Sequence, residues 1–488
     1  MKYELKDILY GVSLISTAGK MDISVKGLTF DSRKVGVGFV FIAIKGTQVD
    51  GHNFIDQSIE RGASVIVCED LPKKIKDTTT YVQVKDASRA IGIMAANFYD
   101  NPSRKLKVLA VTGTNGKTTI VTLLYKLFSS LGHKSGMLST VHNEIDGKII
   151  PATHTTPDAM SINELFAQMV KENCEYCFME ASSHAIHQNR MAGIDLTGAL
   201  FSNITHDHLD YHQTFDNYII AKKKLFDELK KEAFTLYNKD DKRGAVMVQN
   251  TKAGVYSFGL KTPADYKGKI LSNTFQGLEM QLDGVDAWFR LVGDFNASNM
   301  LAVYGCARLL GFEKQEIIRE LSAITPASGR FEMVSPGQKL TTIVDYAHTP
   351  DALENVLRTI NEIRTKNEKL ITVIGCGGNR DKEKRPQMAR IAVSLSDQVV
   401  LTSDNPRDEA PSAIIDDMKA GISGADFKKY LVVEDRKEAI KTAISLSMDG
   451  DIILVAGKGH ETYQEIKGER HHFDDREVIR DILKQINN

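Results

Sequence analysis

Residues 108–120 constrain the fold more than any other part of the sequence. They read Val-Leu-Ala-Val-Thr-Gly-Thr-Asn-Gly-Lys-Thr-Thr-Ile, an apolar run typical of a buried strand, a short turn with two glycines, and the start of a helical pattern. Such a corner points unpaired backbone N–H groups at an anion, and the lysine adds positive charge. The pattern predicts a phosphate-binding loop made of Gly113, Thr114, Asn115, Gly116, Lys117, Thr118 and Thr119.

This loop is tighter than the general Walker pattern, whose first glycine would fall at Val111. A plain strand–turn–helix corner without a ligand is therefore an alternative. Gly116, Lys117 and Thr118 follow one another at the switch from strand to helix, which favours the phosphate loop. In that loop the Thr118 hydroxyl can also reach a magnesium ion.

Length and two polar segments predict the domain organisation. A chain of 488 residues is too long for one hydrophobic core, and about three domains are expected. Residues 100–104 and 325–330 are polar, contain proline and suit linkers. We expect an α/β protein with a small α/β domain at residues 1–103, a central P-loop domain with a parallel sheet at 104–328, and a Rossmann-like α/β domain at 329–488.

The outer domains show recognisable strand and helix patterns. In the first domain, strands are predicted at 28–30, 39–44 and 64–67, and a helix at 54–61. In the third domain, strands are predicted at 341–344, 370–374, 398–401 and 452–455, and a helix starts after Thr349.

Composition excludes several classes of protein. The net charge of -1 offers no broad basic surface, so we expect no nucleic-acid partner. No apolar run is long enough to span a membrane, and the charged residues 1–7 do not resemble a signal peptide, so we expect a cytoplasmic protein. Five cysteines suit reduced thiols. Cys174 and Cys177 form a lone C-x-x-C, for which buried thiols are favoured over zinc.

Glu180 is the first candidate metal ligand outside the loop. It ends an apolar run at 176–179 that we expect to be a neighbouring parallel strand. A carboxylate at the carboxyl end of such a strand suits magnesium. The alternative is a cap for the next helix.

A histidine cluster follows a third predicted strand at 198–202. His206, His208 and Asp210 nearly spell a two-zinc hydrolase motif, but Tyr211 stands where its last histidine belongs, and His212 comes one place late. A metal hydrolase is thus one alternative class. A single metal ligand beside the nucleotide site is the other interpretation.

Three loops of the third domain follow predicted strands at the same edge of a sheet: 375–381, 402–408 and 457–461. Ligands bind at such edges. A dinucleotide site is not favoured, because Arg380 replaces the third glycine of the fingerprint. Arg380, Arg385 and Arg407 suit an acidic small ligand, since guanidinium groups bind carboxylates in pairs of hydrogen bonds. Alternatively, these arginines pair with Asp381, Asp404 and Asp408.

These motifs together resemble those of the Mur ligase family, ATP-dependent enzymes that add amino acids to the cell-wall precursor. The resemblance covers essentially the whole chain and implies ATP and Mg²⁺ as co-substrate and cofactor. It rests on residues 112–119, 180–184, 203–210, 329–332 and 345–351.

Within that family, residues 404–407 resemble the signature of members that add meso-2,6-diaminopimelate to UDP-N-acetylmuramoyl-L-alanyl-D-glutamate. The resemblance implies a diaminopimelate site of Arg385, Asp404, Asn405, Pro406, Arg407, Gly457 and Glu461. In it, Arg385 and Arg407 hold the distal carboxylate, while Gly457 and Glu461 read the distal amino group. Lysine-adding relatives differ in this motif, and a folate-polyglutamylating relative should lack it.

The resemblance also implies the remaining site residues. UDP-muramoyl dipeptide contacts are expected at Ser32, Thr47, Gln48, Val49, Thr155, Thr156, Ser182, Gln188 and Arg190. Metal ligands are expected at Thr118, Glu180, His208 and a carbamylated Lys222, although spacing alone makes residues 222–224 a solvated helix face. Contacts to ATP from beyond the linker at 325–330 are expected from Arg330, Asp345 and His348. The catalytic groups that the resemblance implies are Lys117, Lys222, His208 and Arg330.

The implied reaction transfers the γ-phosphoryl group of ATP to the D-glutamyl carboxylate, and the amine of diaminopimelate attacks the resulting acyl phosphate. The expected partners are therefore three small molecules: the UDP-linked dipeptide, diaminopimelate and ATP. No membrane partner is expected, and the protein is expected to be a monomer. A nucleotide-dependent switch or motor is the other class that shares the loop, but it would not need the arginine-lined loops.

Overall fold

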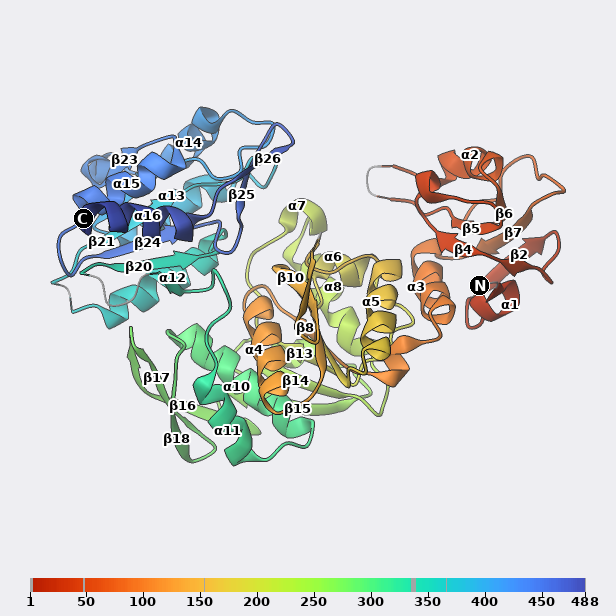
Figure 1. The fold of residues 1–488 in the computed structure, drawn as a ribbon, viewed down its shortest axis with the longest axis horizontal. Helices are drawn as coiled ribbons and strands as arrows, with labels where there is room; N and C mark the ends of the chain where they lie inside the picture. Colours follow the sequence, from red (N-terminus) through yellow and green to blue (C-terminus); the bar gives the residue numbers. More distant parts are fainter. Residues whose placement is uncertain (1–2, 47–48, 153, 335–338, 366, 488) are drawn as a thin grey trace.

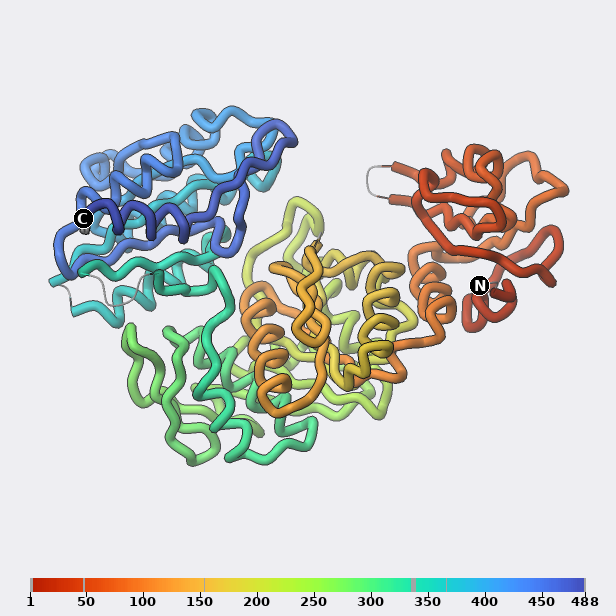
Figure 2. The backbone as a smooth tube through the Cα atoms, viewed as in Figure 1, coloured from red at the N-terminus to blue at the C-terminus, as the bar shows by residue number. Residues whose placement is uncertain are grey.

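The computed structural model describes residues 3–46, 49–152, 154–334, 339–365 and 367–487. Of residue 487 only the backbone is described. Three sheet-centred parts follow one another along the chain, and each is formed by one continuous segment (Figure 1, Figure 2). We call them the N-terminal, middle and C-terminal parts. The boundaries predicted at residues 103 and 328 stay a prediction.

The N-terminal part is a five-stranded sheet in the order β2-β7-β6-β5-β4, parallel except for β2. Its elements are α1 (Leu5–Ile8), β2 (Leu14–Ala18), β4 (Gly27–Thr29), β5 (Phe39–Ile42), α2 (Ile55–Glu60), β6 (Ala63–Cys68), β7 (Thr80–Val84) and α3 (Ala87–Phe98), with a small β1 (Tyr3–Glu4) and β3 (Ser24–Val25) pair. The predicted strands and helix fall on β4, β5, β6 and α2. The sequence analysis did not predict β2, β7 or α3.

The middle part is organised around β8 (Lys107–Thr112), the strand before the predicted phosphate loop. Its side chains alternate between two hydrophobic cores: Leu109 and Val111 enter one, Val108 and Ala110 the other. Helices α4 (Lys117–Ser130), α10 (Asp294–Leu309) and α11 (Lys314–Ala323) cover the first face. Helices α5 (Ala159–Lys171), α6 (Ser183–His187) and α8 (Phe215–Asp227) cover the second. Burial on both faces explains the continuous apolar run.

The sheet of the middle part has eleven strands, in the order β11-β10-β9-β12-β8-β13-β14-β15-β16-β17-β18. The run from β9 to β16 is parallel, as predicted, but antiparallel strands extend both edges. The remaining elements are β9 (Ser135–Leu138), β10 (His142–Ile145), β11 (Lys148–Pro151), β12 (Tyr176–Glu180), β13 (Gly198–Phe201), α7 (Leu209–His212), β14 (Phe234–Asn238), α9 (Gly244–Met247), β15 (Gly254–Gly259), β16 (Tyr266–Thr274), β17 (Gly277–Leu282) and β18 (Val285–Phe289).

The C-terminal part is a six-stranded sheet in the order β19-β20-β24-β21-β22-β23, parallel except for β19. A hairpin, β25 (Tyr463–Ile466) and β26 (Glu469–His472), follows the last strand. The other elements are β19 (Glu332–Val334), β20 (Thr341–Asp345), α12 (Pro350–Ile363), β21 (Leu370–Ile374), α13 (Lys384–Leu395), β22 (Gln398–Leu401), α14 (Pro411–Lys419), β23 (Tyr430–Val432), α15 (Arg436–Leu446), β24 (Ile452–Ala456) and α16 (Asp475–Asn487).

The three parts touch at defined points. Between the N-terminal and middle parts, Arg89 pairs with Glu228, and Gly92 lies so close to Ala192 that an added Cβ would be 2.6 Å from its carbonyl oxygen. Between the middle and C-terminal parts, Asn115 Nδ2 donates to Asp351 Oδ2 at 2.6 Å. The phosphate loop therefore faces the C-terminal part.

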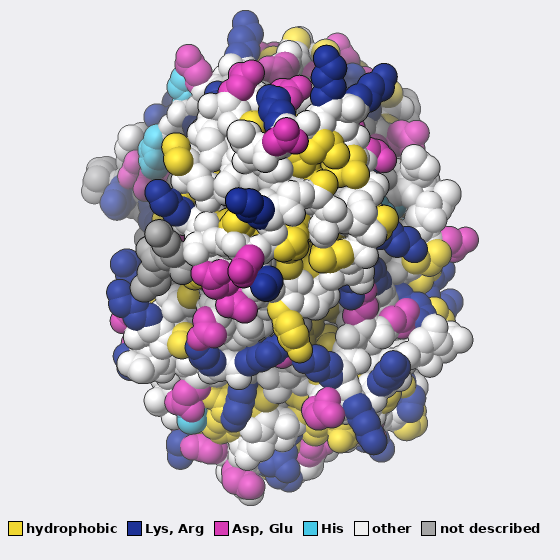
Figure 3. All heavy atoms as spheres, turned by 90° about the vertical axis from the view of Figure 1, so that its right-hand side faces the viewer, with side chains coloured by type: hydrophobic (Ala, Val, Ile, Leu, Met, Phe, Trp, Pro, Cys, Tyr) yellow, Lys and Arg dark blue, Asp and Glu magenta, His cyan; other side chains and the backbone are white. Residues whose placement is uncertain are grey.

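Three further observations concern the surface charge, the helices and the cysteines. Figure 3 shows acidic and basic side chains intermixed over the visible face of the molecule. In the part of the chain that the structure describes, none of the helices combines the length and apolar character needed to cross a membrane. All five cysteines are buried and free, as the buried-thiol interpretation of Cys174 and Cys177 predicts.

Candidate active site

The phosphate loop needs glycine at two positions. Gly116, directly before α4, has φ +88°, and an added Cβ would lie 2.5 Å from Asn299 Oδ1. At Gly113 an added Cβ would lie 2.0 Å from Ser202 Oγ. Asn203 at the end of β13 then holds the loop, since its carbonyl accepts from Thr114 N at 2.8 Å and its side chain from Asn115 N at 2.9 Å. The loop is thus preformed around an open helix N-terminus.

Lys117 lies over the turn of this loop. Its Nζ donates to the carbonyls of Gly113 and Thr114, both at 2.9 Å. Burial lowers the pKa of Lys117, and nearby Glu180 partly offsets the effect. The charge therefore lies beside the loop, where a bound phosphate would need it.

Glu180 provides a buried oxygen that suits a cation. Its Oε1 accepts from Thr118 Oγ1 at 2.9 Å and from Thr140 N at 2.7 Å, while Oε2 is buried and has no hydrogen-bond partner. A buried carboxylate oxygen without a partner is costly unless a cation neutralises it. The capping alternative is wrong, because Ser182 caps α6 by accepting from Ala185 N. Thr118 and Glu180 thus fit a bound magnesium ion.

The histidines that follow β13 do not form a zinc cluster with one another in the part of the chain that the structure describes. The rings of His184 and His208 are 4.9 Å apart, while His206 packs on Phe215 at 5.0 Å. Burial, followed by the charge of His184, lowers the pKa of His208 to about 3, so its imidazole is neutral near pH 7. Among the described residues, no group of three or more His, Cys, Asp or Glu side chains could hold a metal. The two-zinc hydrolase interpretation has no ligand set there.

Lys222 corrects the expectation of a solvated lysine face. It is 1% exposed, and its Nζ donates to the carbonyl of Gly113 at 2.9 Å. The side chain occupies the buried face of α8 with Tyr218 and Phe226, whereas Lys223 pairs with Asp227 and Lys224 with Asn189. Burial, and then the charge of Lys117, keeps the pKa of Lys222 well below its usual range.

The expected dipeptide contacts of the middle part form one hydrogen-bonded cluster next to Glu180. Thr156 Oγ1 donates to the Glu180 carbonyl at 2.8 Å and accepts from Ser182 N at 3.1 Å. Arg190 donates to the Thr156 carbonyl at 2.7 Å and to Gln188 Oε1 at 2.7 Å. Thr155 joins through Thr140, whose hydroxyl donates to it at 3.2 Å.

The expected contacts of the N-terminal part lie on a different sheet. Ser32 begins a short 3-10 helix, and its carbonyl accepts from Arg61 at 2.6 Å. Val49 is 56% exposed. Thr47 and Gln48 lie outside the described residues.

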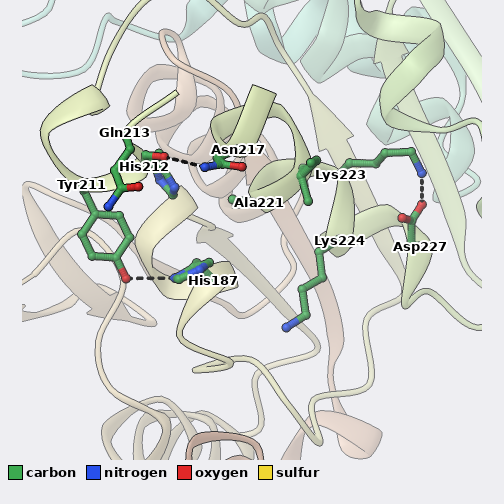
Figure 4. A pocket seen from close by; sticks show the side chains of 10 residues that line it. His187, Tyr211, His212, Gln213, Asn217, Ala221, Lys223, Lys224 and Asp227 are labelled. Carbon is green, nitrogen blue, oxygen red and sulfur yellow. Dashed lines mark hydrogen bonds and ion pairs between the residues drawn. The ribbon is translucent and has the colours of Figure 1, made fainter. Parts of the chain in front are cut away.

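Tyr211 is a residue that the sequence analysis did not single out. It lines a pocket of about 580 Å³ with His187, His212 and the exposed side of α8 (Figure 4). Its hydroxyl is 3.0 Å from His187 Nδ1 and accepts from Gln188 Nε2 at 3.0 Å. Through Gln188 the pocket therefore adjoins the hydrogen-bonded group of Thr155, Thr156, Ser182, Gln188 and Arg190, which we call the Thr156 cluster. In the sequence, Tyr211 stands out only because it occupies the place of the last histidine of the zinc motif, which gives no sign of a pocket.

Two arginines of the C-terminal loops have different surroundings. Arg385 is fully buried and donates to Glu409 at 2.9 and 3.0 Å and to Asp417 at 2.8 Å. This pairing lowers the pKa of Glu409 to about 2. Arg407 Nε lies 3.5 Å from Glu465, and Nη1 donates to the Gly378 carbonyl at 2.9 Å. The alternative of ion pairs within the protein is thus confirmed for both arginines, but the partners are Glu409, Asp417 and Glu465 and not Asp381, Asp404 and Asp408.

The remaining predicted diaminopimelate residues converge where the loops after β22 and β24 meet. Asn405 Nδ2 donates to Glu461 Oε2 at 2.8 Å. Gly457 has φ +114°, and an added Cβ would lie 2.7 Å from Asp404 Oδ2. Pro406 continues the same loop to Arg407, which adopts φ +53°. The structure thus brings together residues about 50 positions apart in sequence, as predicted from the parallel-strand order.

Arg330, Asp345 and His348, which are expected to contact ATP, have different hydrogen-bond partners. Arg330 Nη2 donates to Thr118 Oγ1 at 3.1 Å, and its Nε is buried without a partner. Both oxygens of Asp345 accept from backbone N–H groups, of Phe331 at 2.6 Å and of Ala347 at 2.7 Å. Burial lowers the pKa of His348 to about 4, so its ring is neutral near pH 7. Arg330 links the C-terminal part directly to the phosphate loop.

A phosphate loop on a parallel sheet, faced by a second parallel sheet with its own loop cluster, defines a phosphate-loop enzyme that uses a nucleoside triphosphate. Comparison with known families narrows the class. The chain matches the Mur ligase middle domain over residues 111–307, the Mur ligase glutamate ligase domain over 329–459 and the Mur ligase catalytic domain over 24–99. The protein belongs to the Mur ligase family and is an ATP-dependent ligase.

Individual relatives agree with this assignment. The chain is 59% identical to the UDP-N-acetylmuramoyl-L-alanyl-D-glutamate--2,6-diaminopimelate ligase of Cytophaga hutchinsonii, over 98% of this chain and 99% of that one. It is 41% identical to the protein of the same name from Geobacillus kaustophilus, over 94% and 95%. A solved structure of that name has 32% identity, covers 100% of both chains and superposes with a TM-score of 0.71.

Proposed function

We propose that this protein is the ATP-dependent ligase that adds meso-2,6-diaminopimelate to UDP-N-acetylmuramoyl-L-alanyl-D-glutamate during peptidoglycan precursor synthesis. The observation that carries the proposal is the 59% identity, across 98% of the chain, with a relative of that name. The loop cluster of Asp404, Asn405, Arg407, Gly457 and Glu461 supports it, because it offers charges of both signs to a zwitterionic amino acid.

The chemistry requires activation of a carboxylate, because an oxide ion does not leave when an amine attacks. The γ-phosphoryl group of ATP is transferred to the D-glutamyl carboxylate, which forms an acyl phosphate and ADP. The amine of diaminopimelate attacks the acyl carbon, and the tetrahedral intermediate collapses to an amide and phosphate. Negative charge gathers first on the transferring phosphoryl group. Lys117 and Arg330, which both approach the loop, stabilise that charge.

Magnesium fits this site. Thr118 and the buried Glu180 oxygen would hold one ion, and His208 with a carbamylated Lys222 would hold a second. When bound, the ions neutralise negative charge on the phosphate oxygens. Carbamylation of Lys222 belongs to the proposal, because an ammonium group cannot ligate a cation and a carbamate can. The burial of Lys222 supports it, because burial lowers the pKa of this amine and the neutral amine is the form that reacts with carbon dioxide.

The three parts then divide the substrates. Residues 1–103 bind the UDP moiety through Ser32 and residues 47–49, and the Thr156 cluster holds the dipeptide. Residues 104–328 bind ATP, with Asp345 and His348 completing the site from residues 329–488, which bind diaminopimelate. The protein acts as a monomer, and closure of the C-terminal part brings the amine to the acyl phosphate.

One competition assay tests this function. Purified protein is given ATP, Mg²⁺ and the UDP-linked dipeptide, with equal amounts of meso-diaminopimelate, lysine and ornithine, and the products are identified by mass spectrometry. We expect the diaminopimelate adduct to dominate, with one ADP formed for each amide. A dominant lysine adduct would identify the lysine-adding relative. If no adduct of the dipeptide forms, but a parallel reaction with ATP, glutamate and a folate yields a glutamylated folate, the protein is the folate relative.

A further inference from the structure

We call the loops at 375–381, 402–408 and 457–461 the diaminopimelate loops. Lys458 lies in the last of them, and neither the mechanism nor the resemblance assigns it a role. Its side chain is fully buried. Nζ donates to Glu461 Oε2 at 3.0 Å and to Asn405 Oδ1 at 3.1 Å. Asn405 completes the triangle by donating to the same Glu461 oxygen at 2.8 Å. A buried ammonium group thus touches two residues that are proposed to bind the incoming amino acid.

The charges around this triangle do not cancel. Asp404 and Glu461 contribute two carboxylates, and Lys458 contributes one ammonium. The charge of the neighbouring Arg436 is balanced by Asp475, with two contacts of 2.8 Å between fully buried side chains, and Arg436 also donates to the Ala456 carbonyl at 3.0 Å. The group formed by Asp404, Glu461 and Lys458 therefore has a net charge of minus one, which a single ligand ammonium would neutralise. Nearby Arg407 would take the carboxylate of the same ligand centre.

Charged groups also lie beyond this triangle: Arg470 stacks on the Tyr463 ring at 4.3 Å, and Arg407 pairs with Glu465 at 3.5 Å. Tyr346, from the loop after β20, and Tyr463, at the start of β25, face it as neutral phenols. Burial, and then the charge of Asp404, raises the pKa of Glu461, whereas Lys458 lowers it. Lys458 therefore counteracts the tendency of Glu461 to take up a proton.

We propose that Lys458 is a positioning residue that sets the charge of the amino-acid site: it cancels one of two buried carboxylate charges and holds Glu461 and Asn405 for the distal ammonium of the substrate. The inference rests on the proposed function. It makes the preference for a ligand with a distal ammonium depend on a lysine that touches no substrate. A lysine with a merely structural role would stabilise the loops without tuning their charge.

A double-mutant cycle tests the charge balance. Glu461→Gln leaves Asp404 opposed by Lys458, a net charge of zero. The double variant Lys458→Met/Glu461→Gln leaves Asp404 alone, a net charge of minus one. We expect the KM for diaminopimelate to be lower in the double variant than in Glu461→Gln, by roughly threefold to tenfold. If the double variant is instead the weaker of the two, Lys458 serves only to hold the loops and the inference is overturned.

The pH profile of Lys458→Met gives a second, independent readout. Without the ammonium, Glu461 takes up a proton at higher pH, so the carboxylate needed by the substrate is lost first in acid. The KM for diaminopimelate, compared with the wild type, should therefore rise more at an acidic pH value than at an alkaline one, while the KM for ATP stays unchanged. An increase of the same size at both pH values contradicts the inference.

Two controls separate this inference from the proposed function. Lys441→Met makes the same change at an exposed position of α15 and should match the wild type. Diaminopimelate-dependent ADP formation by the wild type is measured first, and its absence overturns both proposals. When it is present, the order of the two Glu461 variants decides the role of Lys458 alone.

Discussion

The phosphate loop and the loops proposed to bind diaminopimelate are built differently, although each is proposed to hold a charged ligand. The phosphate loop is one continuous segment, 113–119, that ends at the N-terminus of α4, where backbone N–H groups suit an anion. The loops at 375–381, 404–407 and 457–461 instead depend on side chains, and ion pairs such as those of Arg385 with Glu409 and of Lys458 with Glu461 offset part of their charge. A backbone site depends on local geometry, whereas a side-chain site depends on tertiary partners.

The buried pair of Arg436 and Asp475 provides the strongest test of that dependence. Asp475→Asn removes the partner of a fully buried guanidinium, and such a loss costs about 3–5 kcal/mol. We expect amide hydrogen exchange to accelerate in α15 and β24, while exchange in α4 is unchanged. Asp481→Asn, on the exposed side of α16, is the matched control. Equal acceleration in α4 would show that the two regions are not energetically separate.

Lys117 tests the phosphate loop from the other side. Lys117→Met keeps the length of the side chain but removes the charge next to Gly113 and Thr114. Turnover should fall roughly a hundredfold to a thousandfold, the usual loss for one electrostatic contact in a transition state. Calorimetric binding of diaminopimelate should persist. Lys148→Met, at an exposed position, should behave as the wild type, and normal turnover of Lys117→Met would refute the phosphate role.

Arg407 should matter more than its neighbours in the arginine-lined loops. Its nearest carboxylate is 3.5 Å away, so its guanidinium is the less neutralised of the two paired arginines. Arg407→Ala should raise the KM for diaminopimelate roughly tenfold to a hundredfold and leave the KM for ATP nearly unchanged. Arg380→Ala, an exposed change in the adjacent loop, is the comparison. If Arg380→Ala has the larger effect, the carboxylate contact belongs to that residue.

Gln464 should show the smallest effect, because it acts on the loop and not on the ligand. Its amide donates to the Asp404 carbonyl at 2.7 Å from strand β25. Gln464→Leu removes one neutral hydrogen bond, worth about 0.5–1.5 kcal/mol, so the KM for diaminopimelate should rise roughly twofold to tenfold. Gln387→Leu, on the exposed side of α13, should change nothing. An unaltered KM in Gln464→Leu would mean that β25 does not hold the loop.

The same contrast explains which elements the sequence analysis predicted. Buried parallel strands such as β8, β12, β21 and β24 read as apolar runs, because both faces of the sheet are covered. The hairpin strands β16 to β18 were not predicted, because they are antiparallel and largely exposed on one face, so their polar residues obscure the pattern. Strand β2 was not predicted either, because its residues are exposed on both faces and show no alternation of apolar and polar side chains.

Site residues divide along the same line. The glycines of the phosphate loop, Thr118 and Glu180 could be identified from spacing, because each stands next to the strand or helix end that positions it. Lys222 could not, because its burial depends on Gly113, which lies 109 positions away. The ion-pair partners of Arg385, Glu409 and Asp417, could not be predicted from the sequence either, because they meet Arg385 only through the packing of α13 against α14 and the loop before it.

The sequence by itself determined the phosphate loop, the parallel strands beside it and the order of the loops at the sheet edges, because these follow from local geometry and from apolar periodicity. Only the tertiary structure decided which charges meet: the unpartnered oxygen of Glu180, the burial of Lys222 and the balance of Lys458 against Asp404 and Glu461. The physical reason is range. A hydrogen-bonded turn is set by a few consecutive residues, whereas the energy of a buried charge depends on every group packed around it.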